Sequence, residues 1–183
     1  ILEMAEYKKT GTCKILIVTG CMAQRYKEEI TEEIPEVDAV LGTTSYGDIV
    51  KALNEAEAGH VFREFKDINA LPEDSGRRVI TTGGHFGYLK IAEGCDKHCT
   101  YCIIPSLRGK FRSVPEERLL KQAEYMASQG VRELILVAQE TTVYGTDLYG
   151  KKTLHILLKK LCQIKGIRWI RVLYCYPEEI YDE

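Results

Sequence analysis

The sequence predicts an α/β protein in two parts, a partial small doubly wound α/β domain followed by the beginning of a parallel (β/α) barrel. Two observations predict this fold class: short, continuous apolar runs typical of buried parallel strands, and helical segments that separate each run from the next. Periodicity fades over 60–84, where glycine and proline punctuate the chain, which indicates an interdomain linker. We therefore place one domain at 1–59 and the other at 85–183.

The first domain is expected to alternate strands and helices, as doubly wound units do. Its expected elements are a strand at 14–19, a helix at 22–30, a strand at 37–42 and a helix from 43 or 44 to 58. Pro35 closes the first helical segment, because the residue before a proline disfavours helical geometry. Thr43 or Thr44 is the expected cap of the second helix, and Gly59 its stop. Residues 61–65 are expected to add a short edge strand.

The second domain is expected to repeat strand and helix after a first strand that leads into a cysteine-rich loop. Its expected strands are 86–92, 134–138 and 167–174, and its expected helices run from Pro115 to Gly130 and over 154–161. In a parallel barrel, catalytic groups gather at the carboxyl ends of the strands. We therefore expect three segments to face one cavity: the cysteine loop 95–102, then 139–142, then 175–177.

The cysteine loop carries the clearest chemical signal in the chain. Cys95, Cys99 and Cys102 place three thiols close together, and thiolates are soft ligands that select zinc, copper(I) or iron–sulfur clusters. A structural zinc site usually has four ligands in two separated pairs, whereas this is one tight loop with His98 as a further candidate inside it. Three thiolates fit a four-iron cluster with one iron left open for chemistry, whereas ferredoxins use cysteine at every position. A zinc site and a chance grouping of thiols are the alternatives.

Composition narrows the class of protein. The chain has 183 residues, 45% of them hydrophobic, and a formal net charge of −2, which suits a globular core and argues against coating nucleic acid through bulk charge. No apolar run is long enough to cross a bilayer, and the first residues lack a signal-peptide core. Seven cysteines without a secretion signal indicate a cytoplasmic protein. Because the chain opens on Ile1 and stops just after an expected strand, we interpret it as a fragment of a longer protein.

The Cys-x3-Cys-x2-Cys spacing, with Tyr101 before the last cysteine, resembles the cluster loop of the radical S-adenosylmethionine (radical SAM) enzymes. The flanks Tyr88–Gly94, Ile103–Pro105 and Arg108–Lys110 narrow the resemblance to the methylthiotransferases. That family uses a partial version of the (β/α) barrel.

This resemblance has consequences for the domains. It implies that 85–183 is the first half of a radical SAM partial (β/α) barrel, and that 1–59 is the C-terminal part of the methylthiotransferase N-terminal domain. We expect the activity to belong to the full-length parent, because the fragment lacks half of its barrel.

The resemblance also implies the cofactors and the residues that bind them. Cys95, Cys99 and Cys102 would hold a 4Fe-4S cluster, and the amine and carboxylate of S-adenosyl-L-methionine (SAM) would chelate its open iron. One electron from the cluster would then cleave the sulfonium and yield a 5′-deoxyadenosyl radical. Tyr101 would lie against the adenine, with a packing aromatic as the alternative, and Gln139 would meet the methionyl amine.

Cys21 is expected where the first strand meets its helix, at the edge where such sheets bind ligands. Position alone favours a packed small residue there. The segment Val18–Arg25, however, resembles the methylthiotransferase segment that supplies the third of three ligands to an auxiliary cluster. The resemblance therefore implies a second 4Fe-4S cluster in the full-length parent, with its other two ligands before Ile1. Cys13 matches no ligand position.

The run Val137–Tyr149 resembles the methylthiotransferase branch that modifies a ribosomal protein, with Glu140 where that branch more often has Asp. The resemblance implies methylthiolation of the β-carbon of an aspartate in the twelfth protein of the small ribosomal subunit. The expected partners are that protein or the ribosome, an electron-donor protein, and no membrane. Two alternatives stay open: the sibling enzyme that acts on tRNA adenosine, and a non-catalytic zinc-binding structural module.

Overall fold

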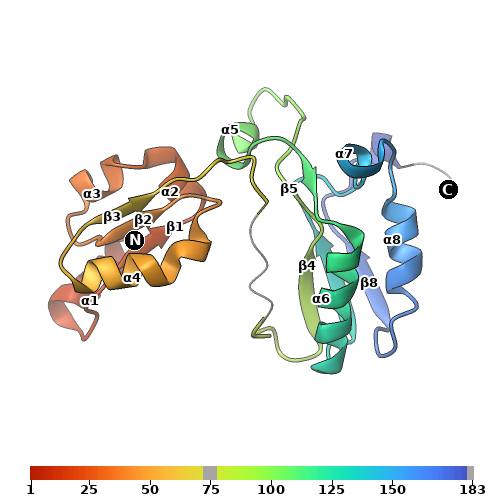
Figure 1. Cartoon of the computed structure of the whole chain (residues 1–183), viewed down its shortest axis with the longest axis horizontal. Helices are drawn as coiled ribbons and strands as arrows, with labels where there is room; N and C mark the ends of the chain where they lie inside the picture. Colours follow the sequence, from red (N-terminus) through yellow and green to blue (C-terminus); the bar gives the residue numbers. More distant parts are fainter. Residues whose placement is uncertain (72–77, 181–183) are drawn as a thin grey trace. The chain divides into compact units, whose positions relative to one another are not determined.

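The computed structural model describes residues 1–71 and 78–180; residues 72–77 of the expected linker and 181–183 of the expected second domain lie outside the described residues. The chain divides into two compact units, Ile1–Ser75 and Gly76–Glu183 (Figure 1). Both units combine helices with a three-stranded parallel sheet, which confirms the α/β fold class. Among the described helices, none is both long enough and apolar enough to span a membrane.

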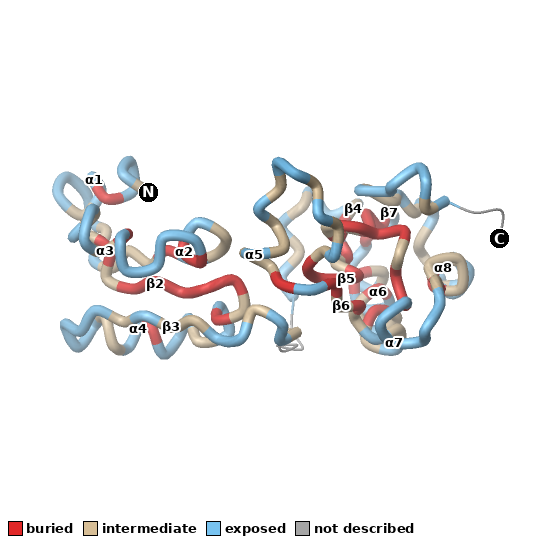
Figure 2. Tube along the Cα trace, turned by 90° about the horizontal axis from the view of Figure 1, so that it is seen from above, coloured by how far each residue is buried: buried red, intermediate tan, exposed pale blue. Residues whose placement is uncertain are grey.

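The first unit is a doubly wound sheet in the order β1-β2-β3. The strands are β1 (Ile17–Thr19), β2 (Ala39–Leu41) and β3 (Phe62–Glu64), and the helices are α1 (Leu2–Thr10), α2 (Cys21–Tyr26), α3 (Glu29–Glu33), η1 (Tyr46–Asp48) and α4 (Ile49–Glu57). Strand β2 is buried throughout because it has a neighbour on each side and helices on both faces (Figure 2). Val40 packs with Ala23 and Ile30 on one face. Ala39 and Leu41 pack with Ala52 on the other.

Three details of the first unit differ from the sequence-based expectation. Helix α1 was not expected, because it buries only Ala5 and so carries no apolar periodicity. The single helix expected at 22–30 is two helices, because Lys27 adopts a positive φ of 42° between α2 and α3. The apolar periodicity gave no sign of this break, because apolar residues on both sides of it, Ala23 and Ile30, pack in the same cluster. Thr43 does not cap a helix, because its hydroxyl donates to the buried Gln24 Oε1 (3.4 Å) and the helical turn begins later, at Tyr46. Thr44 is likewise not a cap, since its hydroxyl donates to the Lys66 carbonyl.

The second unit is built on a parallel sheet in the order β4-β7-β8. These strands are β4 (Phe86–Lys90), β7 (Glu133–Val137) and β8 (Trp169–Val172), and a short antiparallel pair joins β5 (Ala92–Glu93) to β6 (Arg112–Ser113). The helices are α5 (Ile104–Arg108), α6 (Glu116–Ser128), α7 (Thr146–Tyr149), α8 (Leu154–Leu161) and η2 (Pro177–Glu179). Each parallel connection contains a helix, as expected for successive (β/α) units, and the three described strands form an open sheet rather than a closed barrel.

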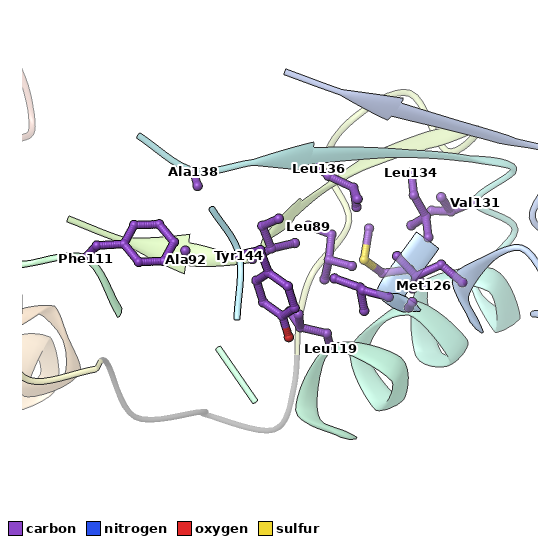
Figure 3. Packing of buried hydrophobic residues seen from close by; sticks show 14 residues of the cluster. Leu89, Ala92, Phe111, Leu119, Met126, Val131, Leu134, Leu136, Ala138 and Tyr144 are labelled. Carbon is purple, nitrogen blue, oxygen red and sulfur yellow. The ribbon is translucent and has the colours of Figure 1, made fainter. Parts of the chain in front are cut away.

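The core of the second unit lies between its sheet and helices α6 and α8. Leu89 of β4 and Leu136 of β7 are fully buried against Leu119 and Met126 of α6 (Figure 3). Burying a side chain of this size contributes roughly 1.5–3 kcal/mol. Tyr144 is also fully buried, and its hydroxyl donates to the Val114 carbonyl at 2.8 Å. This core holds the three parallel strands in register, so that their carboxyl ends share one edge.

Candidate metal and cofactor site

The cysteine loop 95–102 begins at a backbone position that suits glycine. Gly94 has φ +76°, and a Cβ added there would lie 2.1 Å from the Lys110 carbonyl oxygen. The close approach lets the Cys95 amide donate to the Gly109 carbonyl at 3.2 Å. On the other side of the loop, Asp96 Oδ1 accepts from the Phe111 amide at 3.0 Å. The loop start is therefore anchored on the segment 109–111.

The three thiols of the loop are half-buried and form no disulfide. The Cys102 amide donates to the Cys99 carbonyl at 3.0 Å, which turns the chain between these two residues. A hollow of about 470 Å³ lies over this turn and is lined by His98, Cys99, Tyr101 and Cys102 among others. Within residues 1–71 and 78–180, no group of three or more His, Cys, Asp or Glu side chains is arranged so that it could hold a metal ion.

The donor set of the loop nevertheless fits an iron–sulfur cluster. Three thiols are soft ligands of the kind that iron–sulfur centres take, and the hollow provides room beside two of them. Burial raises the pKa of the Cys95 thiol, and the negative charges of Glu140, Cys102 and Asp96 act in the same direction, against a hydrogen bond from the Lys97 amide that lowers it. A bare thiolate at Cys95 is therefore disfavoured, and the positive charge of bound iron would offset that cost.

The structure brings the carboxyl ends of the three parallel strands together, but of the three segments expected to face one cavity only Gln139 lines the pocket between the strand ends, whereas Cys99 and Cys102 line the separate hollow. A pocket of about 380 Å³ is lined by Lys90 from β4, Val137–Gln139 from the end of β7, Tyr174 after β8, and Ile104. Tyr174 has a positive φ of 60°, a conformation that is strained for a tyrosine. Thr141 holds it there, because the Thr141 amide and hydroxyl both donate to the Tyr174 carbonyl, at 3.1 and 3.0 Å.

Gln139 and Tyr101 lie beside the cysteine loop in different ways. Gln139 Oε1 accepts from the Gly94 amide at 2.8 Å, so this side chain ties the end of β7 to the start of the loop. Tyr101 is 90% exposed, so its ring is not a packing aromatic of the core. Their expected contacts with SAM stay predictions.

Sequence reasoning missed a buried carboxylate next to the pocket. Glu93 is 2% exposed, pairs with Lys90 Nζ, and accepts from Arg108 Nη1 at 3.2 Å. A buried carboxylate is tolerated when cations and hydrogen bonds compensate it. Glu93 thereby holds the ammonium group of Lys90, which lines the pocket, and links α5 to β5 through Arg108.

A second group that sequence reasoning missed surrounds Lys97, in the middle of the cysteine loop. Its Nζ pairs with Glu179 at 2.9 Å and Glu140 at 3.9 Å, and lies 3.9 Å from the centre of the Tyr176 ring. Tyr176 Oη in turn lies 3.6 Å from Cys99 Sγ, and the hydrogen bond between them raises the pKa of the Tyr176 phenol. Residue spacing gave no signal for these contacts, because Lys97 and Glu179 are 82 positions apart.

Cys21 belongs to the first unit and is described there. It is half-buried and is the first residue of α2, directly after Gly20, whose φ is +98°. Strand β1 ends at Thr19, so Cys21 follows the carboxyl end of a parallel strand, where such sheets place ligand-binding groups. Its role as a metal ligand stays a prediction.

Comparison with known proteins gives two family matches. The model of the Radical SAM superfamily matches residues 89–182, and that of Uncharacterized protein family UPF0004 matches residues 1–42. The first match begins at the end of β4 and covers the cysteine loop, β7 and β8, and the second covers β1 and β2 of the other unit.

Curated relatives match along the whole chain. A protein named ribosomal protein uS12 methylthiotransferase RimO from Lachnoclostridium phytofermentans is 64% identical over 183 residues, which are 100% of this chain and 42% of the relative. Proteins of the same name from Clostridium botulinum (strain Eklund 17B / Type B) and Clostridioides difficile (strain 630) are 55% and 52% identical, again over 100% of this chain and 41% of each relative. The chain therefore spans about two fifths of the length of the curated relatives it matches.

These matches confirm the resemblance to radical SAM methylthiotransferases. The superfamily match covers the loop of three thiols and the strand ends around it, and it implies a 4Fe-4S cluster and SAM. Because that match extends over more than half of its residues, this chain belongs to the radical SAM superfamily.

Proposed function

We propose that the full-length protein containing this chain is a radical SAM methylthiotransferase that methylthiolates the β-carbon of an aspartate in ribosomal protein uS12. One observation carries the proposal: three thiols on one loop lie at the shared carboxyl edge of three parallel strands, beside a pocket lined by residues from all three strand ends. The relatives support the substrate, since they are named for uS12 methylthiotransfer.

In this proposal, Cys95, Cys99 and Cys102 hold the cluster, and the neighbouring pocket receives SAM. When bound by these three thiolates, the cluster would supply one electron for the reductive cleavage of SAM. Gln139 anchors the loop through Gly94 and presents the rest of its amide to the methionyl group. The exposed Tyr101 ring is available to cover the adenine.

The remaining assignments follow from the same proposal. Residues 1–59 form the C-terminal part of the methylthiotransferase N-terminal domain, 60–84 the linker, and 85–183 the first half of the radical SAM barrel. Cys21 is one ligand of a second 4Fe-4S cluster. The protein works in the cytoplasm on uS12 or the ribosome, and an electron-donor protein reduces it.

The test uses the full-length protein, purified and reconstituted without oxygen. We expect bound iron and sulfide, cleavage of SAM on reduction, and a mass gain on uS12 corresponding to one methylthio group. Parallel incubations with ribosomes and with undermodified tRNA identify the substrate by which product gains mass. Modification of tRNA alone would refute the uS12 assignment, and zinc without sulfide would refute the radical SAM assignment.

A further inference from the structure

Lys97 joins the cysteine loop to two strand ends at once. Its ammonium group pairs with Glu179, in the η2 turn after β8, and faces Glu140, in the segment after β7, while the Tyr176 ring covers it at 3.9 Å. The Lys97 side chain is 27% exposed, so water screens these contacts only in part. Glu179 is itself held in place by Lys152 at 2.7 Å. Lys97 is thus a tether between the loop and the edge of the sheet.

Glu140 is the buried end of this tether. Its side chain is 2% exposed, and one carboxylate oxygen accepts hydrogen bonds from the amide and hydroxyl of Thr142. The other oxygen lies 3.9 Å from Lys97 Nζ. A carboxylate buried to this extent needs a nearby cation, and Lys97 provides it. The pair therefore favours the loop position in which Lys97 lies over the end of β7.

The tether reaches a proposed cluster ligand through Tyr176. Its hydroxyl lies 3.6 Å from Cys99 Sγ, and either atom could donate when both are protonated. A cysteine that binds iron is a thiolate and has no proton to give, so the Tyr176 hydroxyl must then be the donor. Hydrogen bonds to cluster sulfurs and nearby charge are among the features that set cluster reduction potentials.

We propose that Lys97 and Tyr176 are positioning residues of the radical SAM site: Lys97 fixes the cysteine loop on the ends of β7 and β8, and Tyr176, held under the Lys97 ammonium group, donates a hydrogen bond to Cys99. The inference rests on the proposed function for the identity of the bound group. The tether itself is a property of the protein chain. A donor to sulfur and an adjacent positive charge both stabilise the more negative, reduced cluster, so both residues raise its potential.

The first experiment measures the tether in cluster-free, full-length protein by hydrogen exchange of the amides in 95–102. Lys97→Met removes the charge at nearly constant length and should speed exchange roughly fivefold, the effect of losing a partly exposed ion pair. Lys97→Arg, which keeps the charge, should remain near wild type. Glu140→Gln, which keeps the shape of Glu140, should change exchange in the same direction as Lys97→Met. Exchange that is unchanged in both Lys97→Met and Glu140→Gln overturns the tether.

The second experiment measures the reduction potential of the reconstituted cluster. Tyr176→Phe should lower the potential relative to wild type, and Lys97→Met should shift it in the same direction. Tyr125→Phe is the matched control, because it removes a phenol hydroxyl from the outer helix α6, where that hydroxyl donates to the Arg78 carbonyl. Equal potentials in Tyr176→Phe and Tyr125→Phe overturn the hydrogen bond to Cys99. A wild-type protein that binds no cluster refutes the proposed function instead, while the exchange experiment still decides the tether.

Discussion

Replacing Gly94 with alanine tests how the fold presents the cysteine loop. Gly94 combines φ +76° with backbone atoms on the side where a Cβ would point: the carbonyl oxygens of Lys110 and Gly109 would lie 2.1 and 2.6 Å from it. Those carbonyls belong to the segment that leads into β6, and one of them accepts from the Cys95 amide. The added methyl group must therefore push this segment away from the loop.

The expected cost has two parts. A left-handed backbone conformation costs a residue with a Cβ about 1–2 kcal/mol, and forcing an extra carbon into a tightly packed site costs about 1–3 kcal/mol. Gly94→Ala should therefore lower the stability of the β5–β6 region by about 2–5 kcal/mol. Gly150→Ala is the matched control, because Gly150 has a similar φ of +69° and no atom within 4 Å of its added Cβ. It should cost only the conformational part, about 1–2 kcal/mol.

The assay is hydrogen exchange of the amides in 91–95 and 109–114 of the cluster-free, full-length protein, together with iron and sulfide content after reconstitution. Gly94→Ala should speed exchange strongly in both segments and lower cluster occupancy. Gly150→Ala should leave both segments unchanged. If the two variants behave alike, the close approach at Gly94 does not position the loop, and the reasoning fails.

Three further predictions follow. Leu136→Ala should lower the free energy of unfolding, measured by urea denaturation, by about 2–5 kcal/mol, because Leu136 is fully buried in the central strand β7. The control Leu148→Ala should lower it much less, since Leu148 is 43% exposed. Replacing Cys95, Cys99 and Cys102 together with serine should abolish SAM cleavage by the full-length protein, whereas Cys21→Ser should lower the iron content of the reconstituted protein. Full SAM cleavage by the triple-serine variant would place the cluster elsewhere. Lys152 first, and then Lys97, hold the pKa of Glu179 at about 2, below its ordinary 4.5. The ion pair therefore stabilises the folded protein above pH 4.5, where the wild-type protein should have a higher urea midpoint than Glu179→Gln. This difference in midpoint should disappear as the pH falls towards 2, and a difference that persists there would contradict the charge argument.

The apolar patterns of the sequence predicted the main strands and helices near the site, since strand and helix formation depends on residues close together in the chain. The runs at 86–92 and 167–174 contain β4 and β8, and the run at 134–138 covers β7 except for Glu133. The signal is strongest for β7, whose three central residues are buried in succession, because a central parallel strand needs apolar residues on both faces. The short helices α5 and α7 and the break at Lys27 were not predicted, because a few residues without strong periodicity carry little local signal. Domain boundaries and ligand assignments stay predictions.

The sequence by itself determined the α/β class, the order of the six described parallel strands and of the longer helices α4, α6 and α8, and the loop of three thiols with its family resemblance, since all of these depend on residues near one another in the chain. Only the tertiary structure decided which distant groups meet at that loop. Gln139 reaches Gly94 and Glu179 pairs with Lys97 because parallel strands bring their carboxyl ends to one edge. No spacing rule encodes such contacts, since their geometry depends on the packing of the whole sheet.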